Sequence, residues 1–304
     1  MPALASTFRA HLRRWWTYQR ERFPLHAHGP LVAVFSFASV AVAAAVHGTT
    51  PSAGAVGGAF VVALAFFWML RVADEFKDAS EDRRHRPHRP VPRGLIGLRE
   101  LGVSGVVAAG VQLVCVVALA PAALPVLVVA WAYFALMSVE FFAPRRLAAR
   151  PALYLVSHAV ITPLIAAVCA AFVGGAASGV DVAWLLAASL FGSLVIEIGR
   201  KLRAPSAEQP GVETYTKLWG RQWAVSAWLA ALIGAAGCAV AAGGRIGGAW
   251  TVGAVLGLML LGAAGAALRF LQTPEGRAAR WFEPLSGAFV LGLYGTLAVG
   301  ALLS

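Results

Sequence analysis

The sequence predicts an all-α integral membrane protein, a bundle of nine transmembrane helices with a cytoplasmic N-terminus. Of its 304 residues, 59% are hydrophobic and only 13% are charged, whereas soluble domains carry about 25% charged residues. Apolar runs of roughly 20 residues, the length that crosses a bilayer, recur along the chain. The basic residues gather in alternate loops between these runs, as the positive-inside rule requires.

Residues 1–30 precede the first apolar run and carry five arginines. Leu12, Trp15 and Trp16 recur near helical spacing, and arginines lie between them. Tryptophan favours the headgroup region of a membrane, and arginine favours the adjacent water. We therefore expect residues 1–30 to form a cytoplasmic interfacial amphipathic segment, with a soluble arm as the alternative.

Residues 31–304 are expected to form one membrane domain, because no Ser/Pro-rich linker divides the apolar runs. The nine expected spans are approximately 30–47, 55–75, 100–119, 122–142, 152–174, 183–203, 222–242, 247–271 and 284–303. With the N-terminus inside, every lysine and arginine except Arg245 falls in a cytoplasmic segment. The net charge of +11 is then explained by membrane topology, so we expect no nucleic-acid partner.

A dense acidic cluster follows directly on the second apolar run, and its members are Asp74, Glu75, Asp78, Glu81 and Asp82. Asp74, Asp78 and Asp82 are spaced by four residues, which predicts one helix face over two turns. Like charges this close repel one another, and bound Mg²⁺ would relieve that repulsion. The alternative is a solvated acidic face neutralised by nearby bases. Ionisable groups beside a membrane span are usually functional, so we favour a metal site whose candidate ligands are Asp74, Glu75, Asp78, Asp82 and Glu197.

Basic residues accompany these carboxylates at the ends of the second and sixth apolar runs. Arginine suits phosphate groups because its planar guanidinium binds two oxygens at once. The candidate ligands for a substrate diphosphate are Arg71, Arg93, Arg200, Lys201 and Lys217. Arg71 could equally neutralise its acidic neighbours, and the loop bases could serve topology alone.

The acidic cluster reads Asp74-Glu75-x-x-Asp78-x-x-x-Asp82 and is followed by Arg89-Pro90-Val91-Pro92-Arg93-Gly94. This pattern resembles the first aspartate-rich motif of the UbiA-type membrane prenyltransferase superfamily, Asn-Asp-x-x-Asp-x-x-x-Asp with an Arg-Pro-x-x-x-Gly element. The resemblance implies Mg²⁺-dependent transfer of an isoprenyl group from a prenyl diphosphate to a lipophilic or aromatic acceptor. It implies catalytic roles for Asp78, Asp82 and Arg89. The second motif departs from the family pattern, because Glu197 is the one carboxylate on that helix.

The altered second motif leaves other activities open, namely those of a UbiA-like terpene cyclase or another lipid-phosphate transferase. A cation-binding transporter is a further alternative, although the one-sided distribution of charge favours a site at a single membrane face. We expect the protein in a bacterial cell membrane, surrounded by lipid, with its active site facing the cytoplasm. The acceptor and the oligomeric state are not predicted.

Overall fold

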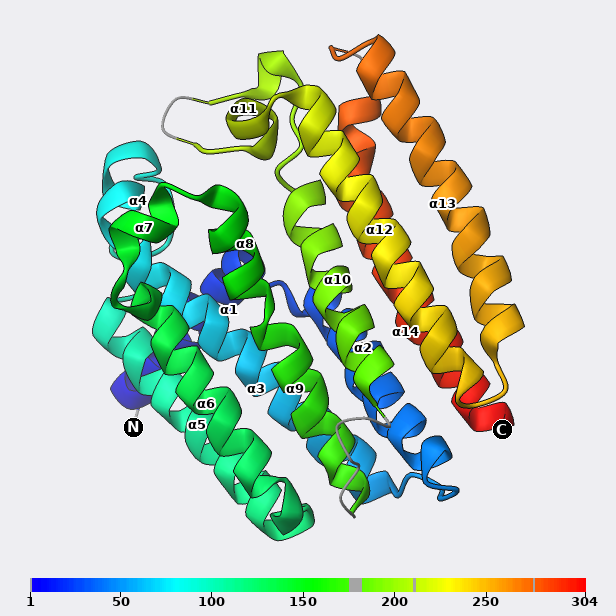
Figure 1. Cartoon of the computed structure of the whole chain (residues 1–304). Coiled ribbons are helices and arrows are strands. Elements are labelled where there is room, and N and C mark those ends of the chain that lie inside the picture. Colours follow the sequence, from blue (N-terminus) through cyan, green and yellow to red (C-terminus); the bar gives the residue numbers. More distant parts are fainter. Residues whose placement is uncertain (1, 175–181, 210–211, 276) are drawn as a thin grey trace.

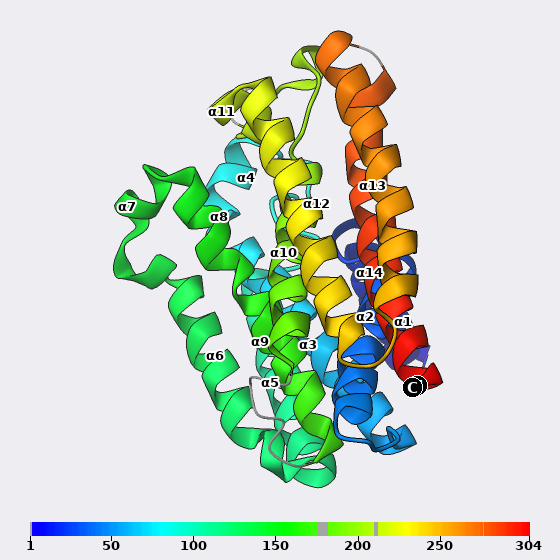
Figure 2. The same cartoon turned by 45° about the vertical axis from the view of Figure 1, so that its right-hand side comes forward.

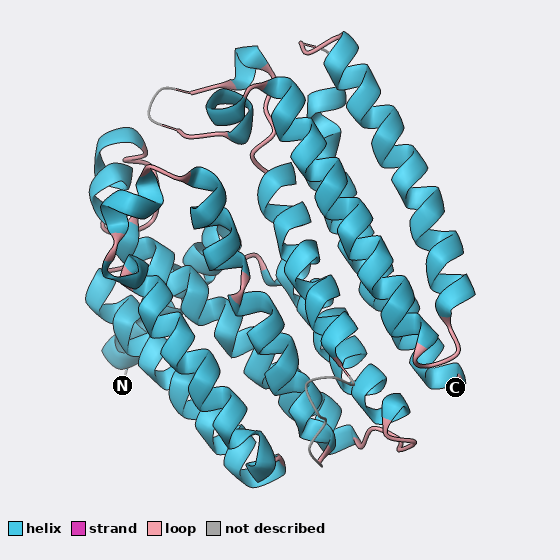
Figure 3. Cartoon of the chain, in the orientation of Figure 1, coloured by secondary structure: helices cyan, strands magenta, loops and turns pink. Residues whose placement is uncertain are grey.

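The computed structural model describes residues 2–174, 182–209, 212–275 and 277–304. Throughout these residues the chain forms helices joined by turns and loops, with no strand (Figure 3). Among the described residues, eight helical segments are long and apolar enough to cross a membrane. An all-α membrane bundle is therefore confirmed.

Eight of the nine expected spans correspond to these segments. They are α2 (Leu25–Val46), α3 (Ala53–Lys77), α5 (Leu98–Leu119), η1 with α6 (Pro121–Ala123, Leu124–Ser138), α8 with α9 and η3 (Pro151–Ala159, Ile161–Ala170, Ala171–Val173), α12 (Arg221–Gly244), α13 (Ala249–Gln272), and η5 with α14 (Arg277–Trp281, Phe282–Leu303). The remaining expected span is the sixth, 183–203. Its helix, α10 (Ala183–Gly199), is apolar but has only 17 residues.

The remaining helices are short or lie before the first span. They are α1 (Pro2–Arg22), α4 (Ala79–His85), η2 (Glu140–Phe142), α7 (Pro144–Ala148), η4 (Pro205–Ala207) and α11 (Tyr215–Trp219). Helices α4, α7 and α11 gather at one end of the bundle, where α3 and α10 also end (Figures 1 and 2). Both charged motifs therefore lie at the same end of the molecule.

The acidic cluster is divided between two helices rather than carried by one. The Ser52 hydroxyl caps the start of α3 by accepting a hydrogen bond from the Ala55 N–H at 3.1 Å. Asp78 ends α3 and precedes α4 directly, with its backbone still in the right-handed helical region. Prolines 87, 90 and 92 follow α4 and exclude further helix. The carboxylates of α3 and α4 consequently face different surroundings.

Small residues allow close helix contacts in this bundle, as expected where lipid provides no hydrophobic drive for helix association. Gly199 at the end of α10 faces Ser286 and Trp228. A Cβ atom added at Gly199 would lie 2.0 Å from Ser286 Oγ and 3.0 Å from Trp228 Nε1. These two groups are already hydrogen-bonded to each other at 2.9 Å. The α10 end that carries Glu197 is thus held directly against α12 and α14.

We expect Gly199→Ala to destabilise the protein by about 1–3 kcal/mol, because the added methyl group overpacks this contact. Thermal unfolding in detergent would measure the loss. Gly237→Ala in α12 is the matched control, since a Cβ at Gly237 meets no atom within 4 Å. Equal melting temperatures for the two variants would contradict the prediction.

Candidate functional site

The last turn of α3 presents two carboxylates that remain available for a ligand. The Asp74 side chain is 57% exposed and its ion pair with Arg71 is long, at 3.4 Å. Asp78, one turn further, is half-buried. Its side chain makes no hydrogen bond or ion pair within the described ranges, and its charge repels that of Asp74. The two carboxylates together therefore form a site that favours a cation.

Glu75 is held differently, although it is adjacent to Asp74 in sequence. Its side chain is 1% exposed, and Arg22 of α1 donates a hydrogen bond from Nε to Glu75 Oε1 at 2.6 Å. Arg71 Nε lies 3.7 Å from the same oxygen. Glu75 is thus a buried anion between two guanidinium groups.

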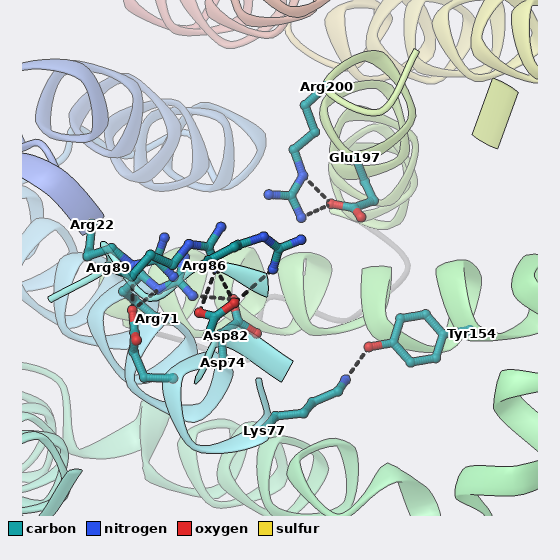
Figure 4. A network of polar contacts seen from close by, with 11 residues as sticks. Arg22, Arg71, Asp74, Lys77, Asp82, Arg86, Arg89, Tyr154, Glu197 and Arg200 are labelled. Atoms are coloured by element: carbon teal, nitrogen blue, oxygen red, sulfur yellow. Dashed lines mark hydrogen bonds and ion pairs between the residues drawn. The ribbon is translucent and has the colours of Figure 1, made fainter. Parts of the chain in front are cut away.

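Asp82 is also buried and organises the Arg-Pro element. Arg89 Nη1 donates to both carboxylate oxygens of Asp82, at 2.8 and 2.7 Å, and Arg86 Nη1 donates to Oδ1 at 2.8 Å (Figure 4). Burial alone raises the pKa of Asp82, but the hydrogen bonds from Arg89 and Arg86 outweigh it and hold the pKa below its usual value. Asp82 therefore fixes two arginines beside the acidic end of α3.

The second motif lies opposite the first. Glu197 accepts a hydrogen bond from Arg200 Nε at 2.6 Å and forms an ion pair with Lys201 Nζ at 2.9 Å. The charges of Arg200 and Asp74 are close enough to attract each other across the two helices. Figure 4 shows Glu197 and Arg200 on one side, with Asp74, Asp82 and the other arginines on the other. The ends of α3 and α10, which carry the two motifs, thus lie at the same end of the bundle (Figure 1).

Two expected diphosphate ligands make no contact with these carboxylates in the described residues. Arg93 is exposed and forms two hydrogen bonds with Glu21 of α1, at 2.8 and 3.0 Å. Lys217 is exposed on α11, and its side chain makes no polar contact within the part of the chain that the structure describes. Arg71, Arg200 and Lys201 are therefore the expected basic residues that the structure places beside the carboxylates.

A sequence model described as the UbiA prenyltransferase family matches residues 32–293, which is most of the chain. The protein belongs to the UbiA prenyltransferase family. No functionally curated protein matches the sequence.

Two solved structures share the UbiA fold. One is described as a UbiA homolog from Aeropyrum pernix K1 in its apo form; it is 14% identical, covers 89% of this chain and 97% of its own, and has a TM-score of 0.66. The other comes from work on digeranylgeranylglyceryl phosphate synthase in membranes; it is 15% identical, covers 96% of this chain and 100% of its own, and has a TM-score of 0.59. At these identities the similarity establishes the fold alone.

UbiA-family enzymes generally depend on a divalent metal, and the donor set here fits one mode of Mg²⁺ binding. In the described residues no group of three or more His, Cys, Asp and Glu side chains could enclose a metal. Mg²⁺ commonly takes one or two carboxylates and completes its shell with substrate phosphates and water. The Asp74–Asp78 pair offers that number of ligands, whereas Glu75, Asp82 and Glu197 are each bonded to basic side chains.

Sequence reasoning missed a polar contact between α3 and α8. Lys77 Nζ is hydrogen-bonded to the Tyr154 hydroxyl (Figure 4) and lies 4.5 Å from the centre of that ring. Lys77 Nζ also forms an ion pair with Glu140 at 3.0 Å. Glu140 begins three successive non-glycine residues with φ between 51° and 56°, a left-handed conformation that costs free energy. Nothing in the local spacing of Lys77 identifies a partner 77 positions away.

Proposed function

We propose that this UbiA-family protein catalyses Mg²⁺-dependent transfer of an isoprenyl group from a prenyl diphosphate to a lipophilic or aromatic acceptor. Family membership supports prenyl transfer in general. The observation that supports the specific proposal is that Asp74 lies opposite Arg200, with Asp78 one helical turn further along α3 and Lys201 next to Arg200 (Figure 4). Two available carboxylates facing guanidinium and ammonium groups match the needs of a magnesium diphosphate.

The chain's own residues divide the work of this reaction. Asp74 and Asp78 would hold Mg²⁺, which supplies positive charge to the leaving diphosphate. Arg71, Arg200 and Lys201 would bind the diphosphate oxygens and stabilise the negative charge that develops as the C1–O bond breaks. Asp82 would orient Arg89 toward the same group.

Residues around this centre would protect the allylic cation that remains. The Tyr154 ring already contacts the Lys77 ammonium group and stacks on His158, so apolar and aromatic side chains of the neighbouring spans, rather than Tyr154, would shield this cation from water. The acceptor then forms the new bond to C1 and loses its proton. The acceptor nucleophile sets which product is formed.

We further propose that the chain crosses the membrane nine times and that α10 is the sixth of these crossings. The N-terminus and the active site would then lie at the cytoplasmic face of a bacterial cell membrane. The distribution of lysine and arginine supports this orientation. The position of both motifs at one end of the bundle is consistent with it (Figure 1). Cysteines introduced singly at positions 49 and 86 would test it in intact cells, because a membrane-impermeant thiol reagent should label only the former.

The activity is tested with purified protein in lipid nanodiscs, radiolabelled prenyl diphosphates of several lengths, and acceptors that include aromatic acids, quinone precursors and phosphosugars. We expect diphosphate release that requires Mg²⁺ and a prenylated product with one acceptor class. A hydrocarbon or alcohol formed without any acceptor would instead identify a terpene cyclase. The absence of diphosphate release from every prenyl diphosphate would overturn the proposal.

A further inference from the structure

Helix α1 packs on the polar end of α3 through aromatic side chains. Tyr18 is fully buried, and the rings of Trp15, Tyr18 and Phe23 lie 6.2, 5.8 and 5.5 Å from the ring of Trp68. This helix lies outside residues 32–293, the part of the chain that the family match covers. Family membership therefore assigns it no role.

Ion pairs complete the attachment of α1, and besides the Glu21–Arg93 pair two of them are made by arginines of α1. Arg14 donates to Glu100 at 2.8 Å and to the Leu95 carbonyl at 2.8 Å, which connects α1 to the start of α5. Arg22, at the other end of α1, reaches Glu75 inside the acidic cluster. Each arginine connects α1 to another part of the chain, but the pair of Arg14 is largely exposed, the pair of Arg22 is buried, and only Arg22 touches the candidate site.

Glu75 has two competing guanidinium partners. Arg22 Nε is 2.6 Å from Glu75 Oε1, and both side chains are buried, at 11% and 1% exposed. Arg71 Nε is 3.7 Å from the same oxygen, beyond hydrogen-bond distance. This Arg71 N–H is buried and has no hydrogen-bond partner within the described residues. A buried, unsatisfied, charged donor costs free energy, so it is a strong site for an incoming anion.

We infer that Arg22 is a positioning residue of the diphosphate site and acts through Glu75. By neutralising Glu75, Arg22 prevents that carboxylate from capturing Arg71, and the free Arg71 N–H is left to donate to a diphosphate oxygen. Arg71 lies one helical turn before Asp74 and already faces its carboxylate at 3.4 Å. This inference rests on the proposed function, because it assigns a diphosphate to that position.

The inference is tested by binding of geranylgeranyl thiolodiphosphate, a non-hydrolysable analogue, to the full-length protein with Mg²⁺ in nanodiscs. Arg22→Gln should raise the Kd roughly tenfold, the loss expected when Glu75 takes one charge-assisted hydrogen bond away from the ligand. Arg14→Gln is the control, because it removes an ion pair of α1 without touching the acidic cluster. Its Kd should stay within about twofold of wild type. The melting temperature should fall more in Arg22→Gln, which breaks a buried pair, than in Arg14→Gln, whose partners are 39% and 35% exposed.

The double variant Arg22→Gln/Glu75→Gln separates positioning from a merely structural role. With both charges removed, nothing competes for Arg71, so the Kd should return to within about threefold of wild type, since a neutral amide attracts a guanidinium far less than a carboxylate does. An unchanged Kd in Arg22→Gln would overturn the inference, and so would a double variant that binds as weakly as Arg22→Gln. Absence of binding by the wild type would instead overturn the proposed function itself.

Discussion

Asp78→Asn is expected to lower the rate of Mg²⁺-dependent diphosphate release by about 100-fold to 1000-fold. Asparagine keeps the shape of the side chain but removes the charge, and a metal that stabilises a leaving group contributes several kcal/mol to catalysis. Asp78 forms no competing ion pair within the described residues, so its loss acts on the bound cation rather than on the fold. Release of labelled diphosphate at increasing Mg²⁺ concentrations would measure the effect.

Glu81→Gln is the matched control for Asp78→Asn. Glu81 belongs to the same acidic cluster, but its side chain is exposed on α4, and we expect the rate to stay within about twofold because exposed charges contribute little. The Mg²⁺ concentration for half-maximal rate should rise in Asp78→Asn and stay constant in Glu81→Gln. Equal rates in Asp78→Asn and wild type would exclude Asp78 as a metal ligand.

Asp82→Asn is expected to destabilise the protein by about 2–3 kcal/mol and to weaken diphosphate binding. Removing this carboxylate leaves the guanidinium groups of Arg86 and Arg89 close together without their shared partner, and breaking a buried pair is costly. This expected destabilisation is smaller than is usual for breaking a buried ion pair, because the two arginine side chains are 20% and 23% exposed and can be hydrated again. Thermal unfolding and analogue binding would measure the two effects.

The contribution of Asp82 should also depend on pH in a defined direction. Because its pKa is lower in the folded protein than in the unfolded chain, its stabilisation is complete above the unfolded pKa, about 3.9, and is lost as the pH falls through the folded pKa. The difference in melting temperature between wild type and Asp82→Asn should therefore be constant near neutral pH and shrink in acid. Glu283→Gln is the control, since the Arg203–Glu283 pair is 4.0 Å long and exposed, and a difference of similar size there would contradict the assignment.

The membrane fold was predictable because its main determinants are local in sequence. A span needs about 20 apolar residues in succession, and eight of the expected spans coincide with candidate membrane helices. The expected span 183–203 was less accurate, since α10 ends at Gly199. That glycine packs against Ser286 and Trp228, and such a contact leaves no signal in an apolar run.

The sequence by itself determined the membrane bundle, the acidic cluster at the end of the second span and the resemblance to the UbiA family, because these depend on composition and short spacings. Tertiary structure alone decided which carboxylates are available. Glu75 and Asp74 are neighbours in sequence, yet Arg22, 53 positions away from Glu75, neutralises only Glu75. Asp82 has the same spacing from Asp78 as Asp78 has from Asp74, yet it is buried by Arg86 and Arg89. Charge interactions depend on distance through space and on burial, and neither can be read from spacing along the chain.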